Sequence, residues 1–268
     1  MARWRARYDA SVTNATAATN PFVSKIARAE SSYTAFRDND LVLASTGEEA
    51  PGLTQRVHSA FRAVVLDPEF PCVAARSAIN QNSYRFGMYG KLNSTRSTAG
   101  LARDLFEFVQ EQPTIGGEFT TFITCFDKPK VQDGRAFERL LWQQLERLHD
   151  LDRPRFEWDE TVSRDPNDPR FSFSFAGRAF FIVGLAPSGD RWGRQFPWAT
   201  LVFNSHDQFE RLRENGQFER LQTVIRERDT ELQGDINPNL ADFGEHTEAK
   251  QYAGRKVERD WRCPAIFD

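Results

Sequence analysis

The chain has 268 residues, with 35 basic and 38 acidic side chains and a net charge of −3 at neutral pH. The two signs are interspersed along the sequence, which excludes the basic face that a nucleic-acid backbone usually meets. The apolar runs are far shorter than the ~20 residues that cross a bilayer. We therefore expect neither nucleic acid nor a membrane as a partner.

The N-terminal sequence and the cysteine content bear on location. Residues 1–7 are basic and lead into a Ser-, Thr-, Asn- and Ala-rich stretch rather than into the apolar core of a secretory signal. We expect residues 1–20 to form a mobile N-terminal arm. The three cysteines cannot all pair with one another, which favours a reducing, cytoplasmic location. No linker-like stretch divides the rest, so residues 21–268 are expected to form a single domain.

Helical and extended patterns are intermixed along this domain, without a repeat of fixed length. Apolar residues at helical spacing predict helices over residues 53–66, 101–109 and 137–148. Extended apolar runs predict strands over residues 84–89, 119–126, 171–175, 179–185 and 200–203. The class is α+β or mixed α/β. We adopt α+β, with a mixed β-sheet and flanking helices in a single domain.

Two junctions between these elements carry local signals. The pair Ala176-Gly177 lies between two predicted strands and predicts a tight hairpin turn. Ser205 follows another predicted strand, and its hydroxyl is suited to accept a backbone N–H from the first turn of a helix that begins at His206.

Two of the cysteines stand beside prolines in mirrored order, in Phe70-Pro71-Cys72 and in Cys263-Pro264. A proline fixes its own φ and holds the preceding residue extended, so each thiol lies on a stiff piece of backbone. We expect the two motifs to come together in the fold and to serve one site. The third cysteine, Cys125, lies within a predicted strand and is expected in the core.

The two motifs resemble those of the YqcI/YcgG family, whose members carry a Phe-Pro-Cys motif and a closing Cys-Pro-Phe motif. Similar segments are found at residues 83–90, at residues 177–185 and, beyond Arg191 and Arg194, at residues 201–210. The resemblance covers roughly residues 55 to 265. Two positions depart from the pattern. Ala265 follows Cys263-Pro264, and Ala186 stands where the family often shows a histidine.

The resemblance implies a haem protein. Family members studied as enzymes are haem-dependent N-hydroxylases that act on the guanidine of arginine or related compounds in specialised metabolism. On this resemblance we expect haem b as cofactor, a small guanidine or amine as substrate, and an external electron donor or peroxide. If the loop at Ala186 faces the ligand cavity, its departure from the family changes the distal chemistry or the substrate.

A haem iron needs an axial ligand, and His206 is the first candidate because a strand-to-helix junction presents it and its surroundings match the family best. His58 is a rival on an apolar helical face, where a core histidine is the simpler explanation. Cys72 is another, because a thiolate donates strongly to iron and favours O–O cleavage. His149 and His246 are expected at a helix end and on the surface.

The propionates of a haem need cations, and the best-matched segments hold four arginines, namely Arg85, Arg178, Arg191 and Arg194. An ordinary ion pair is the alternative role for each of them. A substrate guanidinium would also need carboxylates to orient it. Asp207 and Glu210 lie near His206, but their place at a helix start is explained equally well by the helix dipole.

Two other functions are compatible with these residues. One is a haem or small-molecule binding protein without turnover. The other is a thiol-based enzyme that uses Cys72 with Cys263. A haem absorption band would favour the first two functions, whereas a colourless protein with a low-pKa, readily alkylated Cys72 would favour the third.

Overall fold

The computed structural model describes residues 19–237, 239 and 246–268. Of the expected N-terminal arm, residues 1–18 lie outside the described part of the chain. The end of the arm is anchored, because the side-chain amide of Asn20 donates to the Arg103 carbonyl and to the Glu107 carboxylate, each at 2.9 Å.

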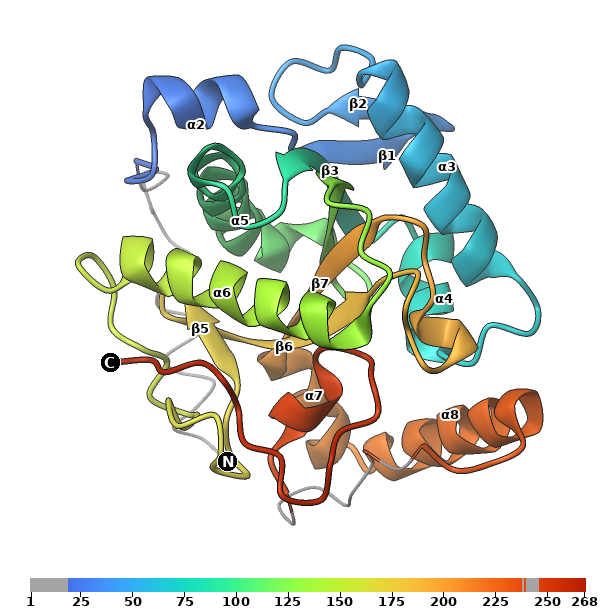
Figure 1. The fold of residues 1–268 in the computed structure, drawn as a ribbon. Helices are drawn as coiled ribbons and strands as arrows, with labels where there is room; N and C mark the ends of the chain where they lie inside the picture. The colour runs from blue at the N-terminus through green and yellow to red at the C-terminus, as the bar shows by residue number, and fades with distance from the viewer. Residues whose placement is uncertain (1–18, 238, 240–245) are drawn as a thin grey trace.

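Seven strands of the described chain form one sheet in the order β2-β1-β3-β4-β7-β6-β5 (Figure 1). The strands are β1 (Thr34–Arg37), β2 (Asp40–Leu43), β3 (Tyr84–Lys91), β4 (Thr121–Lys128), β5 (Phe173–Phe175), β6 (Arg178–Leu185) and β7 (Ala199–Ser205). Strands β3 and β4 pair in parallel, whereas the other neighbouring pairs are antiparallel. The predicted α+β class with a mixed sheet is confirmed.

Helices connect and flank these strands. They are α2 (Lys25–Glu30), α3 (Gly52–Leu66), α4 (Val73–Asn80), α5 (Thr95–Ile115), α6 (Gly134–Asp152), α7 (His206–Glu214), α8 (Phe218–Gln233) and the 3₁₀ helices η1 (Trp192–Arg194) and η2 (Glu248–Gln251). The three predicted helices correspond to α3, α5 and α6. Both α5 and α6 extend beyond the predicted bounds at each end, and they start where Ser94 and Asp133 cap their N-termini with side-chain oxygens.

The predicted turn at Ala176-Gly177 joins β5 to β6. Both residues have positive φ, at 51° and 69°, which is the backbone of a type I′ hairpin turn. The junction at Ser205 differs from expectation. Helix α7 does begin at His206, but the Ser205 hydroxyl makes no cap hydrogen bond. Ser205 is still paired with Phe180 as the last residue of β7, so its geometry is set by the sheet.

Alternate residues of the central strands pack on opposite faces of the sheet, as a strand's period of two requires. In β4, Phe122 and Phe126 belong to a core formed with α5 and α6. Ile123 and Cys125 belong to a second core formed with α3 and α4. Cys125 is fully buried there, as predicted, with its sulfur 3.2 Å from the Thr200 hydroxyl. The sheet therefore separates two hydrophobic cores.

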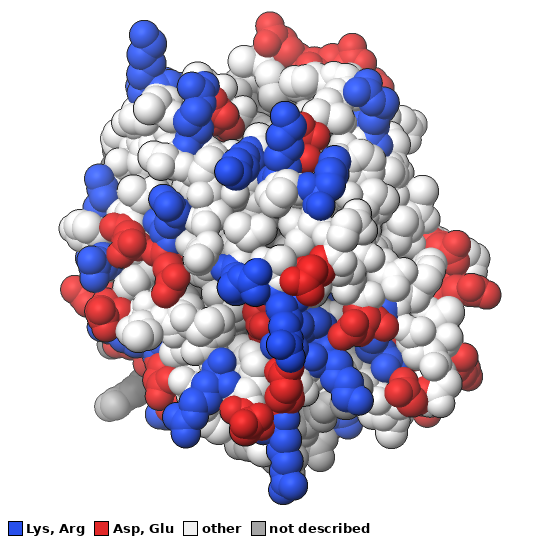
Figure 2. Space-filling view, in the orientation of Figure 1, with Lys and Arg blue, Asp and Glu red and all other residues white. Residues whose placement is uncertain are grey.

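The surface shown in Figure 2 carries basic and acidic side chains interspersed with uncharged ones, rather than gathered by sign. Several of these charges form ion pairs, such as Arg135 with Glu258 at 2.6 Å. Within the described ranges, no helix combines the length and the apolar character that a membrane span needs.

Candidate functional site

The α3–α4 face of the sheet holds a largely apolar cavity of about 310 Å³. Its walls come from β6 and β7 of the sheet, from α3 and α4, and from α7 and α8. Apolar lining residues include Phe61, Ala75, Ile79, Ile123, Val183, Val202, Leu221 and Ile225. None of the residues of α8 that the structure describes is fully buried, although Phe218 and Leu221 pack partly buried against a small apolar cluster.

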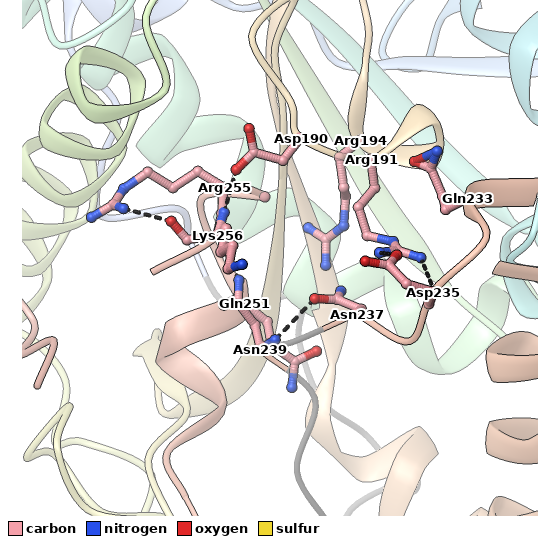
Figure 3. Close-up of a pocket in the computed structure, with 11 residues that line it drawn as sticks. Asp190, Arg191, Arg194, Gln233, Asp235, Asn237, Asn239, Gln251, Arg255 and Lys256 are labelled. Atoms are coloured by element: carbon pink, nitrogen blue, oxygen red, sulfur yellow. Dashed lines mark hydrogen bonds and ion pairs between the residues drawn. The ribbon is translucent and has the colours of Figure 1, made fainter. Parts of the chain in front are cut away.

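A second cavity, of about 390 Å³, adjoins the first and is polar. Residues Arg191, Arg194, Asn237 and Gln251 line both cavities. Figure 3 shows Arg191 and Arg194 extending side by side into the polar cavity, with Asp190 and Lys256 also on its wall. The two spaces therefore form one site, apolar inside and polar at the side where these arginines lie.

Cys72 lies in the wall of the apolar cavity, at the N-cap of α4. Burial raises the pKa of the thiol above its ordinary value. The amides of Ala75 and Ala74 and the charge of Arg194 act in the opposite direction, although Cys72 makes no cap hydrogen bond of ordinary geometry. Burial is the larger effect, so the free thiol is protonated near neutral pH.

The Phe-Pro-Cys motif is held against the η1 segment. The rings of Phe70 and Trp192 lie 6.0 Å apart between centroids. A Cβ atom at Gly193 would lie 2.9 Å from Cγ of Pro71, so this close approach requires glycine. The packing of these two segments brings Cys72 and Arg194 to the same cavity, although they are distant in sequence.

Arg194 is a cation without a carboxylate partner among the described residues. Its guanidinium donates one hydrogen bond, to the Gly184 carbonyl at 3.3 Å. Burial lowers its pKa to about 10, which still leaves it charged at neutral pH. Its exposed surface faces the two cavities. An unpaired charge in this position is suited to an anionic group of a ligand.

The other three predicted arginines have ion-pair partners. Arg191 lines both cavities but pairs with Asp229 at 2.7 Å and Asp235 at 2.8 Å. Arg85 pairs with Glu111, and Arg178 pairs with Asp207 at 3.2 Å. Arg85 and Arg178 do not line either cavity. Of the four candidates, the structure brings only Arg191 and Arg194 to the site.

The two candidate histidines lie outside the cavities. Nδ1 of His206 is 3.1 Å from the Ser172 hydroxyl, and Nε2 is 3.1 Å from the Glu210 carboxylate. Both ring nitrogens of the preferred axial ligand are therefore engaged by protein groups. Nε2 of His58 is 2.7 Å from the Tyr84 hydroxyl, in the core beneath α3. Cys72 is the axial candidate that faces the site.

Cys263 lies on the opposite side of the sheet from Cys72. It packs against the α5–α6 core, whereas Cys72 packs against the α3–α4 core, and both thiols are free. The C-terminal segment runs along α6, where Trp261 Nε1 donates to Glu138 at 2.8 Å and the Ile266 amide donates to Glu146 at 3.2 Å. The expectation that the two cysteine motifs meet is therefore wrong, because the sheet stands between them.

Several lining residues were missed by the sequence reasoning. Helix α8 contributes Leu221, Ile225 and Asp229, and η2 contributes Glu248 and Gln251. The helical spacing of the apolar residues of α8 was visible in the sequence. Nothing local to Glu248 distinguishes it from a surface carboxylate.

Comparisons with known proteins show the family of the chain. Residues 61–266 match the YqcI/YcgG family. The chain is also 29% identical over 208 residues to the uncharacterized protein YcgG of Bacillus subtilis (strain 168), an overlap of 74% of this chain and 81% of that protein. No solved structure matches the chain significantly. The family match spans well over half of the sequence, and the chain belongs to the YqcI/YcgG family.

Proposed function

We propose that this chain is a haem-dependent oxygenase that hydroxylates a nitrogen of a small guanidine or amine. The apolar cavity would hold the haem, Cys72 would bind its iron, and Arg194 would offset the charge of a propionate. The observation that carries the proposal is that a cysteine thiol and an arginine, which has no carboxylate partner among the described residues, line one apolar cavity.

The donor groups of the cavity fit a haem. A flat apolar macrocycle suits walls of aliphatic and aromatic side chains. A thiol that coordinates a metal loses its proton, which would offset the effect of burial on Cys72. The Ala74 and Ala75 amides and the Arg194 charge lower the pKa of that thiol and would stabilise the thiolate form.

When bound, haem would supply one-electron and dioxygen chemistry. The protein's residues would bind the substrate, orient it and exclude water. Helix α8 would close the outer wall, since Arg191 ties it to η1 through Asp229. The polar cavity would provide the route by which a charged substrate leaves water.

The axial ligand can be tested by substitution. The purified protein should show a Soret band and stoichiometric haem by mass spectrometry. Cys72→Ala should abolish stoichiometric haem, whereas Cys263→Ala and His206→Ala, as matched controls, should retain it. An unchanged Soret spectrum in Cys72→Ala would contradict the assignment of Cys72 as the iron ligand. Loss of haem in His206→Ala alone would identify His206 as the ligand instead.

The reaction is tested with reductant or peroxide and a panel of arginine, other guanidines and small amines. The expected product is heavier than its substrate by one oxygen atom. If no compound yields such a product or changes the haem spectrum, a haem-binding protein without turnover becomes the better explanation. A thiol enzyme that uses both cysteines has less support, because Cys72 and Cys263 pack on opposite sides of the sheet.

A further inference from the structure

Glu248 presents its carboxylate to the apolar cavity from a rigid segment. It is the first residue of η2. The Thr247 hydroxyl, just before it, donates to the Pro166 carbonyl at 2.8 Å. Just after η2, the Tyr252 carbonyl accepts the Gly184 amide of β6 at 2.7 Å. Both ends of the segment are therefore fixed to the rest of the fold, and the position of the carboxylate is set by the backbone.

The carboxylate of Glu248 has no hydrogen bond or ion pair within the part of the chain that the structure describes. The charged groups that act on it are Arg213 and Glu210, and these two pair with each other. Burial raises the pKa of Glu248. Placing a carboxylate in such surroundings without a partner costs folding free energy, so this group does not contribute to stability.

The same cavity wall offers a second acceptor. The side-chain amide of Asn204 donates to the Phe181 carbonyl at 3.3 Å, and among the described residues its side-chain oxygen has no donor. Glu248 and Asn204 thus provide two acceptors that line the same cavity. A guanidinium or ammonium group has only N–H donors, so it is complementary to such acceptors.

We propose that Glu248 is the anionic anchor of the apolar cavity, where it pairs with the cationic side-chain group of the ligand, a guanidinium or an amine, and not with an α-ammonium group. This inference rests on the proposed function only in placing a small guanidine or amine in this cavity. The pairing itself requires no haem. A ligand cation would supply the partner that the described part of the chain does not, and it would favour the ionised form of Glu248.

The proposal is tested by calorimetric titration of the purified protein with arginine and agmatine as cationic probes. Citrulline, which keeps the α-ammonium and α-carboxylate of arginine but carries a neutral ureido group in place of the guanidinium, is the matched probe without the side-chain charge. The wild-type protein should bind arginine more tightly than citrulline. Glu248→Gln should weaken binding of the cationic probes roughly 10- to 100-fold, the range for a hydrogen bond to a charged group, and should leave citrulline unchanged.

Glu231→Gln is the matched control, because Glu231 is an exposed residue of α8 that does not line either cavity. This variant should bind every probe like the wild type. Thermal unfolding separates a ligand role from a structural one. Glu248→Gln removes an unpaired charge and should unfold at an equal or higher temperature. If Glu248 stabilised the fold, Glu248→Gln would unfold at a lower temperature than the wild type.

Three results would overturn the proposal: unchanged affinity of Glu248→Gln for the cationic probes, equal wild-type affinity for arginine and citrulline, or no binding of any probe. Haem content is measured on the same samples. Absence of haem together with an intact, Glu248-dependent preference for cations would reject the proposed function and keep the anchor. Stoichiometric haem without an effect of Glu248→Gln would reject the anchor and keep the haem site.

Discussion

Cys72 and Arg194 illustrate how two ordinary residues become a site through their surroundings. Pro71 packs against Gly193, and this contact places the thiol and the guanidinium at one cavity. Neither residue forms an ion pair within the described chain, and burial disfavours the charged form of both. Groups that are costly to bury and have no partner are typical of ligand sites, where a ligand completes them.

Replacing Arg194 tests this view at the residue scale. Arg194→Met should weaken haem binding ~10-fold or more, because it removes the cation that would face a propionate and that lowers the pKa of the Cys72 thiol. The haem-free protein should unfold at an equal or higher temperature, since a buried charge without a carboxylate partner is lost. Haem titration followed by absorbance measures the first effect, and thermal unfolding measures the second.

Arg178→Met is the control for this substitution, because Arg178 pairs with Asp207 and lies outside both cavities. It should leave haem affinity unchanged. If Arg178→Met and Arg194→Met weaken haem binding equally, the effect comes from net charge and not from the site.

At the scale of elements, α8 is attached differently from the other long helices. Glycines with positive φ stand at both ends, Gly216 at 65° and Gly234 at 81°. Phe218 and Leu221 near its start pack against the small apolar cluster of Ala78, Phe119 and Leu212, whereas the C-terminal half is held by polar contacts. Asp229 pairs with Arg191, Arg228 donates to the Phe70 carbonyl at 3.2 Å, and Gln233 accepts the Trp192 amide at 2.8 Å. In Figure 1 this helix lies apart from the layers that cover the sheet.

Hydrogen exchange should show the consequence. With few buried apolar contacts, the amides of α8 should exchange faster than those of α5, whose inner side chains are fully buried. Haem binding should slow exchange in α8 and leave α5 unchanged. Asp229→Asn should speed exchange in α8 by weakening its contact with Arg191. Protection of α8 equal to that of α5 in the haem-free protein would show that α8 is a fixed wall.

The elements also show what the sequence could predict. The strands β4 and β7 were predictable because their alternate residues fill two cores, which leaves nearly continuous apolar runs such as 122–126. The turn Ala176-Gly177 followed from its position between two such runs. Helix α8 carries Phe218, Leu221 and Ile225 at helical spacing, so its existence was accessible, but its role as a cavity wall was not.

At the scale of the whole molecule, the errors come from long-range packing. The mirrored order of the two Cys-Pro motifs does not predict on which face of the sheet each motif packs. The sequence favoured His206 because of its local context. Its partner Glu210 lies four residues along the same helix and could have been foreseen, but its other partner, Ser172, comes from a distant segment. Likewise, the meeting of Cys72 with Arg194 depends on how two loops pack. Local patterns predict elements, whereas the site depends on their assembly.

The stability of the whole fold should depend on pH through His58. Burial, together with the nearby charge of Arg62, lowers the pKa of His58 from 6.5 to about 4. Between these values the unfolded chain binds a proton that the folded chain does not, so stability falls as the pH falls through this window. From pH 7 to pH 5 the loss from this group is about 2 kcal/mol, at 1.36 kcal/mol per pH unit below 6.5.

His58→Gln isolates this contribution, because glutamine keeps a polar group near the Tyr84 hydroxyl but does not titrate. Burial also raises the pKa of Asp104 to about 6 and of Asp152 to about 7, which has the opposite effect on stability over the same range. Both aspartates are present in the variant and in the wild type, so their contribution cancels in the comparison. Urea unfolding at pH 7, 6 and 5 should show that the variant loses about 2 kcal/mol less than the wild type between pH 7 and pH 5. Parallel stability curves for the two proteins would mean that His58 takes up its proton in the folded state as readily as in the unfolded chain.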